Sequence, residues 1–270
     1  MLSHGVLGSL LLASFAIGLS SAVTNEFRTY FNGIGNAHAL TNEQQMNIKN
    51  LRTGTNGHVH LHQDCKAINR FAKKENGIYV IKPKASPPVL VYCDMKTEGG
   101  GWILLQRVKK GSSEFSSKKW VDYKTTFGNI EDNYWLGNEH MHAITKHQRF
   151  EVKFIIQNGT EFVHVDYSSF NIDGKENNYA LRLGYPLNYS EYHEALTEED
   201  NMMFSTEDND NDRDANNNCA KMQGAGWWFN KCSSAMFFGQ RIKWPKICDD
   251  CDSAAILIKP TTENCVSKHN

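Results

Sequence analysis

The amino-acid sequence predicts an α+β fold in which an antiparallel sheet and a few helices share one core. Residues 150–156 alternate apolar and polar side chains, as a half-buried strand does. Residues 161–167 can pair with them across the turn at Asn158-Gly159. Residues 138–147 have the apolar spacing of an amphipathic helix. Strands joined by hairpins, with few helices and long loops, are typical of the α+β class rather than the α/β class.

The remaining predicted elements are short. In the predicted helix, Met141 and Ile144 fall on the inner face, and Asn138 is a favourable N-cap residue. Four apolar, β-rich runs bounded by turn residues predict further strands at 78–81, 89–92, 179–183 and 254–258.

The N-terminus has the pattern of a secreted protein. The apolar run at residues 7–19, followed by small residues at Ser20 and Ala22, predicts a signal peptide over residues 1–22. Residues 23–62 are polar and weakly patterned, which predicts a linker. The apolar run is too short to span a membrane, and a net charge of −1 gives no basic field. We therefore expect an extracellular protein with no membrane insertion and no nucleic-acid partner.

An acidic loop is the strongest functional signal in the sequence. Four aspartates alternate with other residues at Asp208, Asp210, Asp212 and Asp214. Hard carboxylate and carbonyl oxygens suit Ca²⁺, whereas an acidic, solvated loop without an ion is the alternative. An EF-hand requires glycine at its sixth position and glutamate at its twelfth, and neither register of this loop supplies them. The pattern therefore predicts a calcium loop of another kind.

Seven cysteines leave one without an intrachain partner. An unpaired cysteine in a secreted protein predicts a disulfide to a second copy, and hence a homo-oligomer. The spacing of Cys248, Cys251, Cys265 and His269 resembles a set of zinc ligands. The alternative is one disulfide among these three cysteines, with the third pairing between chains.

Two further patterns concern modification and catalysis. Sequons at Asn158 and Asn188 predict N-glycosylation on surface loops. The sequence carries no serine–histidine–acid motif, no H-E-x-x-H motif and no phosphate-binding loop. We therefore expect a binding protein and no enzyme.

Ordered motifs from residue 63 to residue 260 define the domain, followed by a tail at 261–270. The motifs are Asp64-Cys65, Tyr92-Cys93-Asp94-Met95, Gly99-Gly100-Gly101-Trp102, Tyr134-Trp135-Leu136-Gly137-Asn138, Phe204-Ser205-Thr206, Asn218-Cys219-Ala220, Gly226-Trp227-Trp228 and Asn230-Lys231-Cys232. With these motifs the sequence resembles the fibrinogen C-terminal-like domain of ficolins, tachylectins and angiopoietins. The resemblance implies a small N-terminal part, a central antiparallel sheet, and a loop-rich C-terminal part that binds Ca²⁺.

The resemblance also implies a ligand set for the metal. The carboxylates of Asp210 and Asp212 match the side-chain ligands of the family, and the backbone carbonyls of Asp214 and of Asn216 or Asn217 would complete the set. The implied disulfides are Cys65–Cys93 and Cys219–Cys232.

The same resemblance implies a ligand pocket beside the metal. In lectin-like members a cis peptide, here Lys231–Cys232, turns its N–H groups toward an acetyl carbonyl. Ser233 replaces the usual pocket histidine, and Trp228 and Phe229 are the aromatic residues nearby. The alternative for the tryptophans is that at least one of them packs in the core.

The family resemblance predicts what the protein binds. The segment that follows residues 237–239 is much shorter than in the family, which reduces the predicted pocket. The resemblance implies a calcium-dependent lectin for acetylated glycans that acts in innate defence. The alternative is a ligand or adhesion factor that binds a protein receptor.

Overall fold

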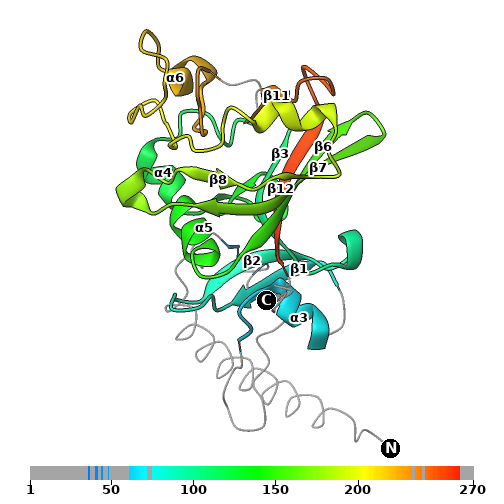
Figure 1. Cartoon of the computed structure of the whole chain (residues 1–270). Helices are drawn as coiled ribbons and strands as arrows, with labels where there is room; N and C mark the ends of the chain where they lie inside the picture. The colour runs from blue at the N-terminus through cyan, green and yellow to red at the C-terminus, as the bar shows by residue number, and fades with distance from the viewer. Residues whose placement is uncertain are drawn as a thin grey trace, which may run out of the picture.

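The computed structural model describes residues 61–71, 75–232, 235–238 and 241–261 (Figure 1). It also describes five earlier residues: Asn36, Leu40, Thr41, Gln44 and Ile48. The predicted signal peptide, Ser233, Cys265 and His269 lie outside the described residues.

A ten-stranded sheet forms the centre of the domain, with the main strand order β1-β2-β3-β12-β6-β7-β8. Its four longest strands are β3 (Trp102–Lys109), β6 (Phe150–Asn158), β7 (Glu161–Ile172) and β12 (Ser253–Pro260). The last of them, β12, lies between β3 and β6 and pairs antiparallel with both (Figure 1). The predicted α+β class is confirmed.

The predicted hairpin and final strand are present. Asn158 of β6 faces Glu161 of β7 across the turn, and the strand predicted at 254–258 is the core of β12. The strand predicted at 179–183 is shorter, β8 (Leu181–Leu183), because Tyr179 adopts a positive φ of 51°. A residue in this left-handed region cannot continue a pleated strand.

The N-terminal part consists of α3 (Cys65–Phe71), β1 (Gly77–Ile81), β2 (Val89–Asp94) and η2 (Thr97–Gly99). Both strands match the sequence prediction. The predicted disulfide Cys65–Cys93 joins α3 to β2. Because β2 pairs with β3 only at Cys93 and Asp94, this part meets the central sheet along a short seam.

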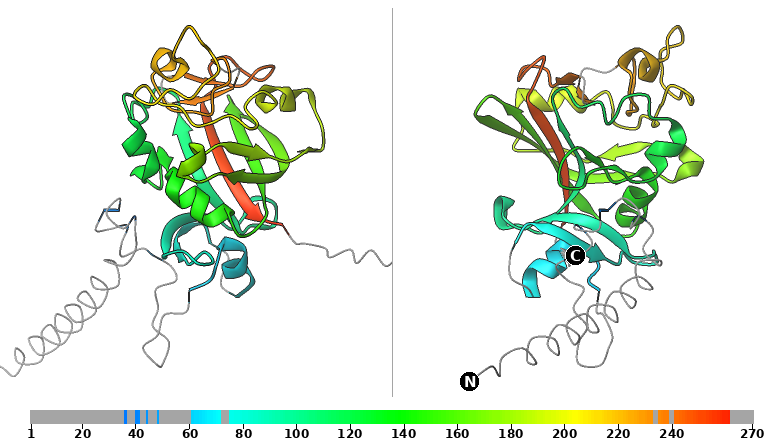
Figure 2. Two further views of the ribbon diagram at one scale, coloured as in Figure 1. Left: turned by 60° about the vertical axis from the view of Figure 1, so that its left-hand side comes forward. Right: turned by 180° about the vertical axis from the view of Figure 1, so that it is seen from behind.

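Helices α4 (Trp120–Lys124) and α5 (Asn138–Thr145) lie on one side of the sheet, where α5 packs against β7 (Figure 2). Met141 and Ile144 are buried, as predicted. The N-cap prediction was wrong by one residue, because the cap is Gly137 and Asn138 is fully buried.

The remaining elements are short and lie mostly in the C-terminal part. They are β4 (Phe127–Gly128), β5 (Tyr134–Trp135), η3 (Lys175–Asn177), β9 (Pro186–Leu187), η4 (Glu191–Leu196), α6 (Cys219–Gln223), β10 (Met236–Phe238) and β11 (Arg241–Lys243).

Part of the predicted linker packs on the domain. The buried Asn36 amide donates to the Leu90 carbonyl and accepts from the Leu90 N–H, each at 2.9 Å. It also donates to the hydroxyl of Thr126 at 3.2 Å. Asn36 thus takes the place of a paired strand beside β2 and connects it to the central part. The polar linker over residues 23–62 stays a prediction, with this residue docked on the domain.

The glycine run before β3 passes close to the backbone of Met95. Gly99 and Gly100 have φ values of 83° and 69°. A Cβ atom on Gly100 would overlap the carbonyl of Met95, whereas one on Gly99 would have no atom within 4 Å. Gly100 also has a ψ of −172°, a backbone combination that is essentially restricted to glycine, so its conformation and the close approach both oppose a side chain there.

We predict that Gly100→Ala destabilises the fold more than Gly99→Ala. A left-handed alanine costs about 1–2 kcal/mol, which Gly99→Ala should show alone. Gly100→Ala adds the overlap with Met95, for a total of about 3 kcal/mol. Urea unfolding of the two variants measures the difference, and equal losses would contradict the close crossing.

We predict that Asn36→Ala lowers the free energy of unfolding by about 2–4 kcal/mol, because it leaves the N–H and carbonyl of Leu90 without partners. Thr41→Ala is the control, since Thr41 and Gln44 form only a part-buried capping pair. Its loss should be about 0.5–1 kcal/mol. Urea unfolding compares the two, and a smaller loss for Asn36→Ala would contradict its role beside β2.

Candidate functional site

The acidic loop is a series of turns closed by its own aspartates. The N–H of Asp212 donates to Asp210 Oδ1 at 3.2 Å, and the N–H of Asp214 donates to Asp212 Oδ1 at 2.8 Å. The N–H of Asn216 then donates to Asp214 Oδ1 at 3.1 Å. Aspartate favours such turns because its side chain bonds the backbone two residues ahead. The repeated turn gathers Asp210, Asp212 and Asp214 in one short segment.

Two hydrogen bonds connect this loop to the corner formed by the Cys219–Cys232 disulfide. The N–H of Cys219 donates to Asp212 Oδ2 at 2.8 Å, and the N–H of Arg213 donates to the carbonyl of Asn230 at 2.8 Å. The loop is anchored on its other side by Asn211, whose side-chain amide donates to the carbonyl of Phe204 at 2.8 Å. The position of the corner therefore depends directly on the conformation of the loop.

The ionised form of Asp210 is unfavourable in this loop, whereas hydrogen bonds from Asn216 and Asn217 lower the pKa of Asp214. Partial burial raises the pKa of the Asp210 carboxyl, and the nearby charges of Asp212 and Asp214 raise it further. Burial also acts to raise the pKa of Asp208, but hydrogen bonds from the Trp120 N–H and the Thr206 hydroxyl outweigh it and lower that pKa. Carboxylate oxygens in this density fit a hard cation such as Ca²⁺, which would offset the repulsion around Asp210.

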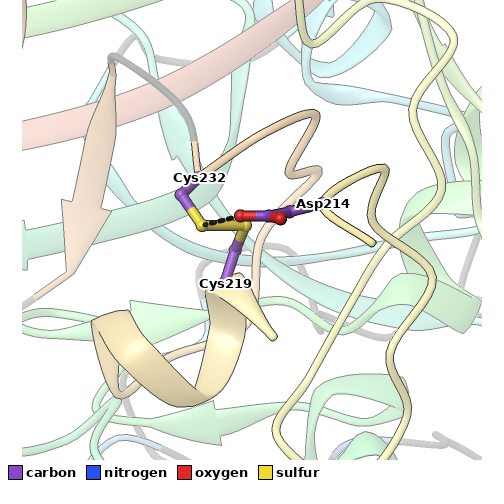
Figure 3. Close-up of side chains that lie close together, drawn as sticks. All are labelled: Asp214, Cys219 and Cys232. Atoms are coloured by element: carbon purple, nitrogen blue, oxygen red, sulfur yellow. Dashed lines mark hydrogen bonds between the residues drawn. A yellow bond between two sulfur atoms is a disulfide. The ribbon is translucent and has the colours of Figure 1, made fainter. Parts of the chain in front are cut away.

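The disulfide Cys219–Cys232 lies against this loop, as predicted (Figure 3). Oδ2 of Asp214 is 3.8 Å from the sulfur of Cys232. Asp214 and the two sulfurs form a compact group, but both sulfurs are bonded to each other and offer no thiolate. The group therefore cannot be a zinc-type centre, and only its carboxylate is available to a hard cation.

The structure differs from the predicted ligand pocket in two respects. The Lys231–Cys232 peptide is trans, as are the other peptide bonds among the described residues. Trp228 and Phe229 are 1% and 0% exposed, so their rings belong to the core and cannot line an open pocket. The indole N–H of Trp228 is satisfied in the core, where it donates to the carbonyl of Tyr179 at 2.8 Å. Of the predicted pocket residues that are described, only Lys231 is exposed and Cys232 is half-buried.

Both predicted glycosylation residues are accessible. Asn158 is exposed at the β6–β7 turn, and Asn188 is exposed beside β9. Glycosylation at these positions stays a prediction.

The C-terminal cysteine motif forms a disulfide between Cys248 and Cys251. The prediction of one disulfide within this motif is confirmed. The zinc alternative was wrong, because sulfurs bonded to each other cannot serve as thiolate ligands. Cys265 lies outside the described residues, so its pairing with a second copy stays a prediction.

Comparison with known proteins agrees with this architecture. Residues 61–251 match the model of the C-terminal globular domain of fibrinogen beta and gamma chains. The protein belongs to this fibrinogen C-terminal domain family. None of the helices among the described residues is long and apolar enough to cross a membrane.

Named relatives share this domain to different extents. The chain is 36% identical to the chicken fibrinogen-like protein 1-like protein, over 70% of this chain and 69% of that protein. It is 38% identical to human tenascin-R, over 66% of this chain but 13% of that protein. It is 34% identical to human angiopoietin-related protein 7, over 72% of this chain and 56% of that protein. The chain therefore spans only part of the length of several relatives.

Solved structures share the fold. The fibrinogen-like globe domain of human ANGPTL2 superposes with a TM-score of 0.69 at 26% identity, over 74% of this chain and all of that domain (100%). Lamprey fibrin D-dimer, solved with the peptide Gly-His-Arg-Pro-amide, gives a TM-score of 0.66 at 23% identity, over 97% of this chain and 92% of that one. The second likeness concerns the fold alone.

The hydrogen-bonding residues that hold the acidic loop and the neighbouring helix α6 in place were not identified from the sequence. Asn211 bonds the loop to Phe204, and Asn218 caps α6 by accepting from the Lys221 N–H at 2.7 Å. The signal for Asn218 was present, since asparagine directly before a helical segment is a favoured N-cap. The role of Asn211 depends on a contact that exists only in the folded protein.

We predict that Asp210→Asn stabilises the chelator-treated protein and abolishes its stabilisation by calcium. The raised folded-state pKa of Asp210 means that the fold binds more protons than the unfolded state between the two pKa values. Its contribution to stability therefore falls as the pH rises through this range, and the ionised group is unfavourable at neutral pH. Thermal unfolding at pH 7, in chelator and in calcium, measures both effects.

Asp208→Asn is the matched control for this prediction. The pKa of Asp208 is lowered, so its carboxylate stabilises the fold above its unfolded pKa, and that contribution is lost as the pH falls. The amide should lower the melting temperature in chelator and in calcium alike. If Asp210→Asn also lowered it in chelator, the electrostatic account of the loop would be wrong.

Proposed function

We propose that this protein is a secreted recognition domain whose binding surface is ordered by Ca²⁺ in the acidic loop. Three disulfides among the described residues support an oxidising, extracellular location. The observation that carries the proposal is the direct bonding of the loop to the corner, from Asp212 to Cys219 and from Arg213 to Asn230. The function is binding, with no chemical step.

The proposed mechanism starts from the electrostatics of the loop. Asp210 and Asp212, with the carbonyls of Asp214 and Asn216, would hold the ion, which supplies the positive charge that the loop lacks. Asp212 would bind Ca²⁺ through one part of its carboxylate while keeping its hydrogen bond from the Cys219 N–H. An ordered loop fixes the carbonyl of Asn230, and with it the exposed Lys231 next in the sequence. Calcium therefore acts on the ligand surface through the backbone.

Acetylated glycans are the first ligand class that we propose. Lys231 and Cys232 lie on an accessible corner, and backbone N–H groups at such a corner can donate to an acetyl carbonyl. A single small site binds weakly, so useful avidity requires several copies of the domain. Six of the seven cysteines pair among the described residues, and we propose that Cys265 joins two copies of the protein.

A protein receptor is the second candidate, favoured by the burial of Trp228 and Phe229. Without these rings the corner lacks the aromatic wall of a sugar pocket. Helix α6, which begins at Cys219, instead carries Met222 with 63% of its surface exposed. An exposed methionine beside an ordered loop suits an adaptable protein interface.

We predict that the secreted protein binds an N-acetylglucosamine resin in calcium and is released by chelator and by free N-acetylglucosamine. Asp210→Asn should not be retained. The control is Asp132→Asn, which removes the same charge outside the acidic loop, where Asp132 pairs with Lys109 on β3. Retention that survives chelator would contradict a calcium-dependent lectin.

Cell binding separates the two ligand classes. Calcium-dependent binding that is lost after glycosidase treatment of the cells, and kept after protease treatment, supports the glycan. Loss after protease alone, with no retention on the resin, replaces the glycan by a protein receptor. Absence of any calcium effect on stability or on binding would refute the proposed function itself.

A further inference from the structure

Helix α3 and the last residues of β12 lie at the end of the domain opposite α6 (Figure 1). A pocket is lined by residues of these two elements and of the glycine run. Its volume is about 570 Å³. It lies on the seam between the N-terminal part and the central sheet. Its lining residues are Lys66, Asn69, Arg70, Glu98, Gly99, Gly100, Glu151 and Lys259.

Three cationic side chains converge on this pocket, and two of them have uncharged partners, although Lys259 also pairs with Glu151. Lys66 Nζ donates to the carbonyl of Pro260 at 2.6 Å. Lys259 Nζ lies 4.2 Å from the ring centroid of Trp102 and donates to the carbonyl of Glu98 at 3.3 Å. Arg70 is exposed on α3. A carbonyl or a ring orients an ammonium group without removing its net charge, so the positive charges persist in the pocket.

The effect of this crowding is visible at Lys66. Burial lowers the pKa of its ammonium group, and the charges of Lys259 and Arg70 lower it further, against the opposing charges of Glu151 and Asp64. The three cations therefore repel one another across the pocket. An anion between them would reduce this repulsion.

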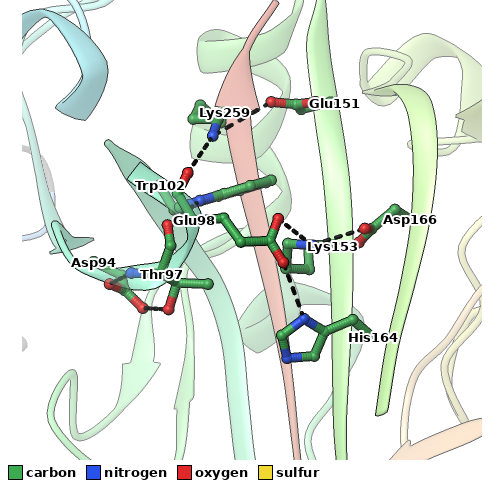
Figure 4. Close-up of polar contacts among 9 residues, drawn as sticks. All are labelled: Asp94, Thr97, Glu98, Trp102, Glu151, Lys153, His164, Asp166 and Lys259. Atoms are coloured by element: carbon green, nitrogen blue, oxygen red, sulfur yellow. Dashed lines mark hydrogen bonds and ion pairs between the residues drawn. The ribbon is translucent and has the colours of Figure 1, made fainter. Parts of the chain in front are cut away.

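The acidic side chains of the lining offset the cations only in part. The carboxylate of Glu98 turns away to Lys153 and His164, at 3.0 and 3.3 Å (Figure 4). Glu151 Oε1 lies 3.6 Å from Lys259 Nζ. Of the two carboxylates in the lining, one is thus directed at a lysine outside the pocket. Three cations then face a single acidic group.

The glycine run leaves the mouth of this pocket open. Gly99 would place a Cβ atom in open space, with no atom within 4 Å. Asn69 holds the loop, because its side-chain amide donates to the carbonyl of Gly99 at 2.8 Å. A ligand can therefore approach the backbone here without meeting a side chain.

We propose that this pocket binds an oxyanion, the sulfate or carboxylate group of an acidic polysaccharide. Lys66, Arg70 and Lys259 would contact the anion, and the guanidinium of Arg70 can do so with two parallel hydrogen bonds. A polysaccharide is the favoured source because the pocket is open and large enough for a sugar ring as well as its acidic group. This site is independent of the calcium loop and goes beyond the proposed function.

The test is a calorimetric titration of the full secreted protein, in chelator, with a sulfated heparin tetrasaccharide. Arg70→Gln and Lys259→Gln should each weaken binding about 10-fold, the loss expected for one charge-assisted hydrogen bond. Lys175→Gln, on the exposed η3, is the charge-matched control and should leave affinity unchanged. Arg70 is exposed, so its variant should keep the parent melting temperature.

Competition experiments identify the source of the anion. Inorganic sulfate should compete at a higher concentration than the tetrasaccharide, because it lacks the sugar contacts. Competition by oligoglutamate as strong as that of the tetrasaccharide would overturn the polysaccharide assignment. No binding, or equal losses in Arg70→Gln and Lys175→Gln, would overturn the site. Because the titration is run without calcium, either result leaves the calcium-dependent function to its own test.

Discussion

The domain depends on the position of β12. This strand pairs with β6 along all of its length, from Ser253 opposite Gln157 to Pro260 opposite Phe150, and with β3 on its other side. Its hydrogen bonds join segments that are about 100 to 150 residues apart in the sequence. The chain entropy lost in bringing these segments together is offset only when the whole sheet has formed. Its two ends lie in different parts of the molecule. The residues before Ser253 include the Cys248–Cys251 disulfide of the C-terminal part, and its last residues contribute Lys259 to the pocket beside α3.

The N-terminal part is attached to this sheet by a few strong contacts. The short β2–β3 pairing is reinforced by the amide of Asn36 and by the ion pair of Glu98 with Lys153. Lys153 is 1% exposed and also pairs with Asp166 at 2.7 Å, so its charge is fully compensated in the interior. Removing both carboxylates would leave the buried Lys153 ammonium unpaired, which is costly, whereas the pair with the exposed Glu98 contributes little net stability. The position of the seam is therefore set by these directional contacts. The pocket lined by Lys66, Arg70 and Lys259, here called the cationic pocket, lies beside it.

The sequence allowed prediction of what local patterns determine. Alternation and an Asn-Gly turn located the β6–β7 hairpin, and alternating aspartates located the acidic loop. Local patterns could not show that Trp228 is buried, because a tryptophan beside a disulfide suits a core and a pocket equally well. They also could not reveal the cationic pocket, since Lys66 and Lys259 are brought together only by the closure of β12. The cap at Gly137 was missed because its φ of 101° is set by the surrounding fold.

The two sites share one physical feature, a local excess of charge of one sign that neighbouring groups of the protein offset only in part. The acidic loop gathers carboxylates around Asp210, and the opposite end gathers ammonium and guanidinium groups around Lys66. The net charge of −1 conceals this separation. Opposite charges held at the two ends of a rigid sheet cannot pair with each other, because screening in physiological salt limits their interaction to about 8 Å. The partners that we propose for the two ends therefore differ in charge, a cation at the acidic loop and an anion at the opposite pocket, and the fold keeps the two sites apart.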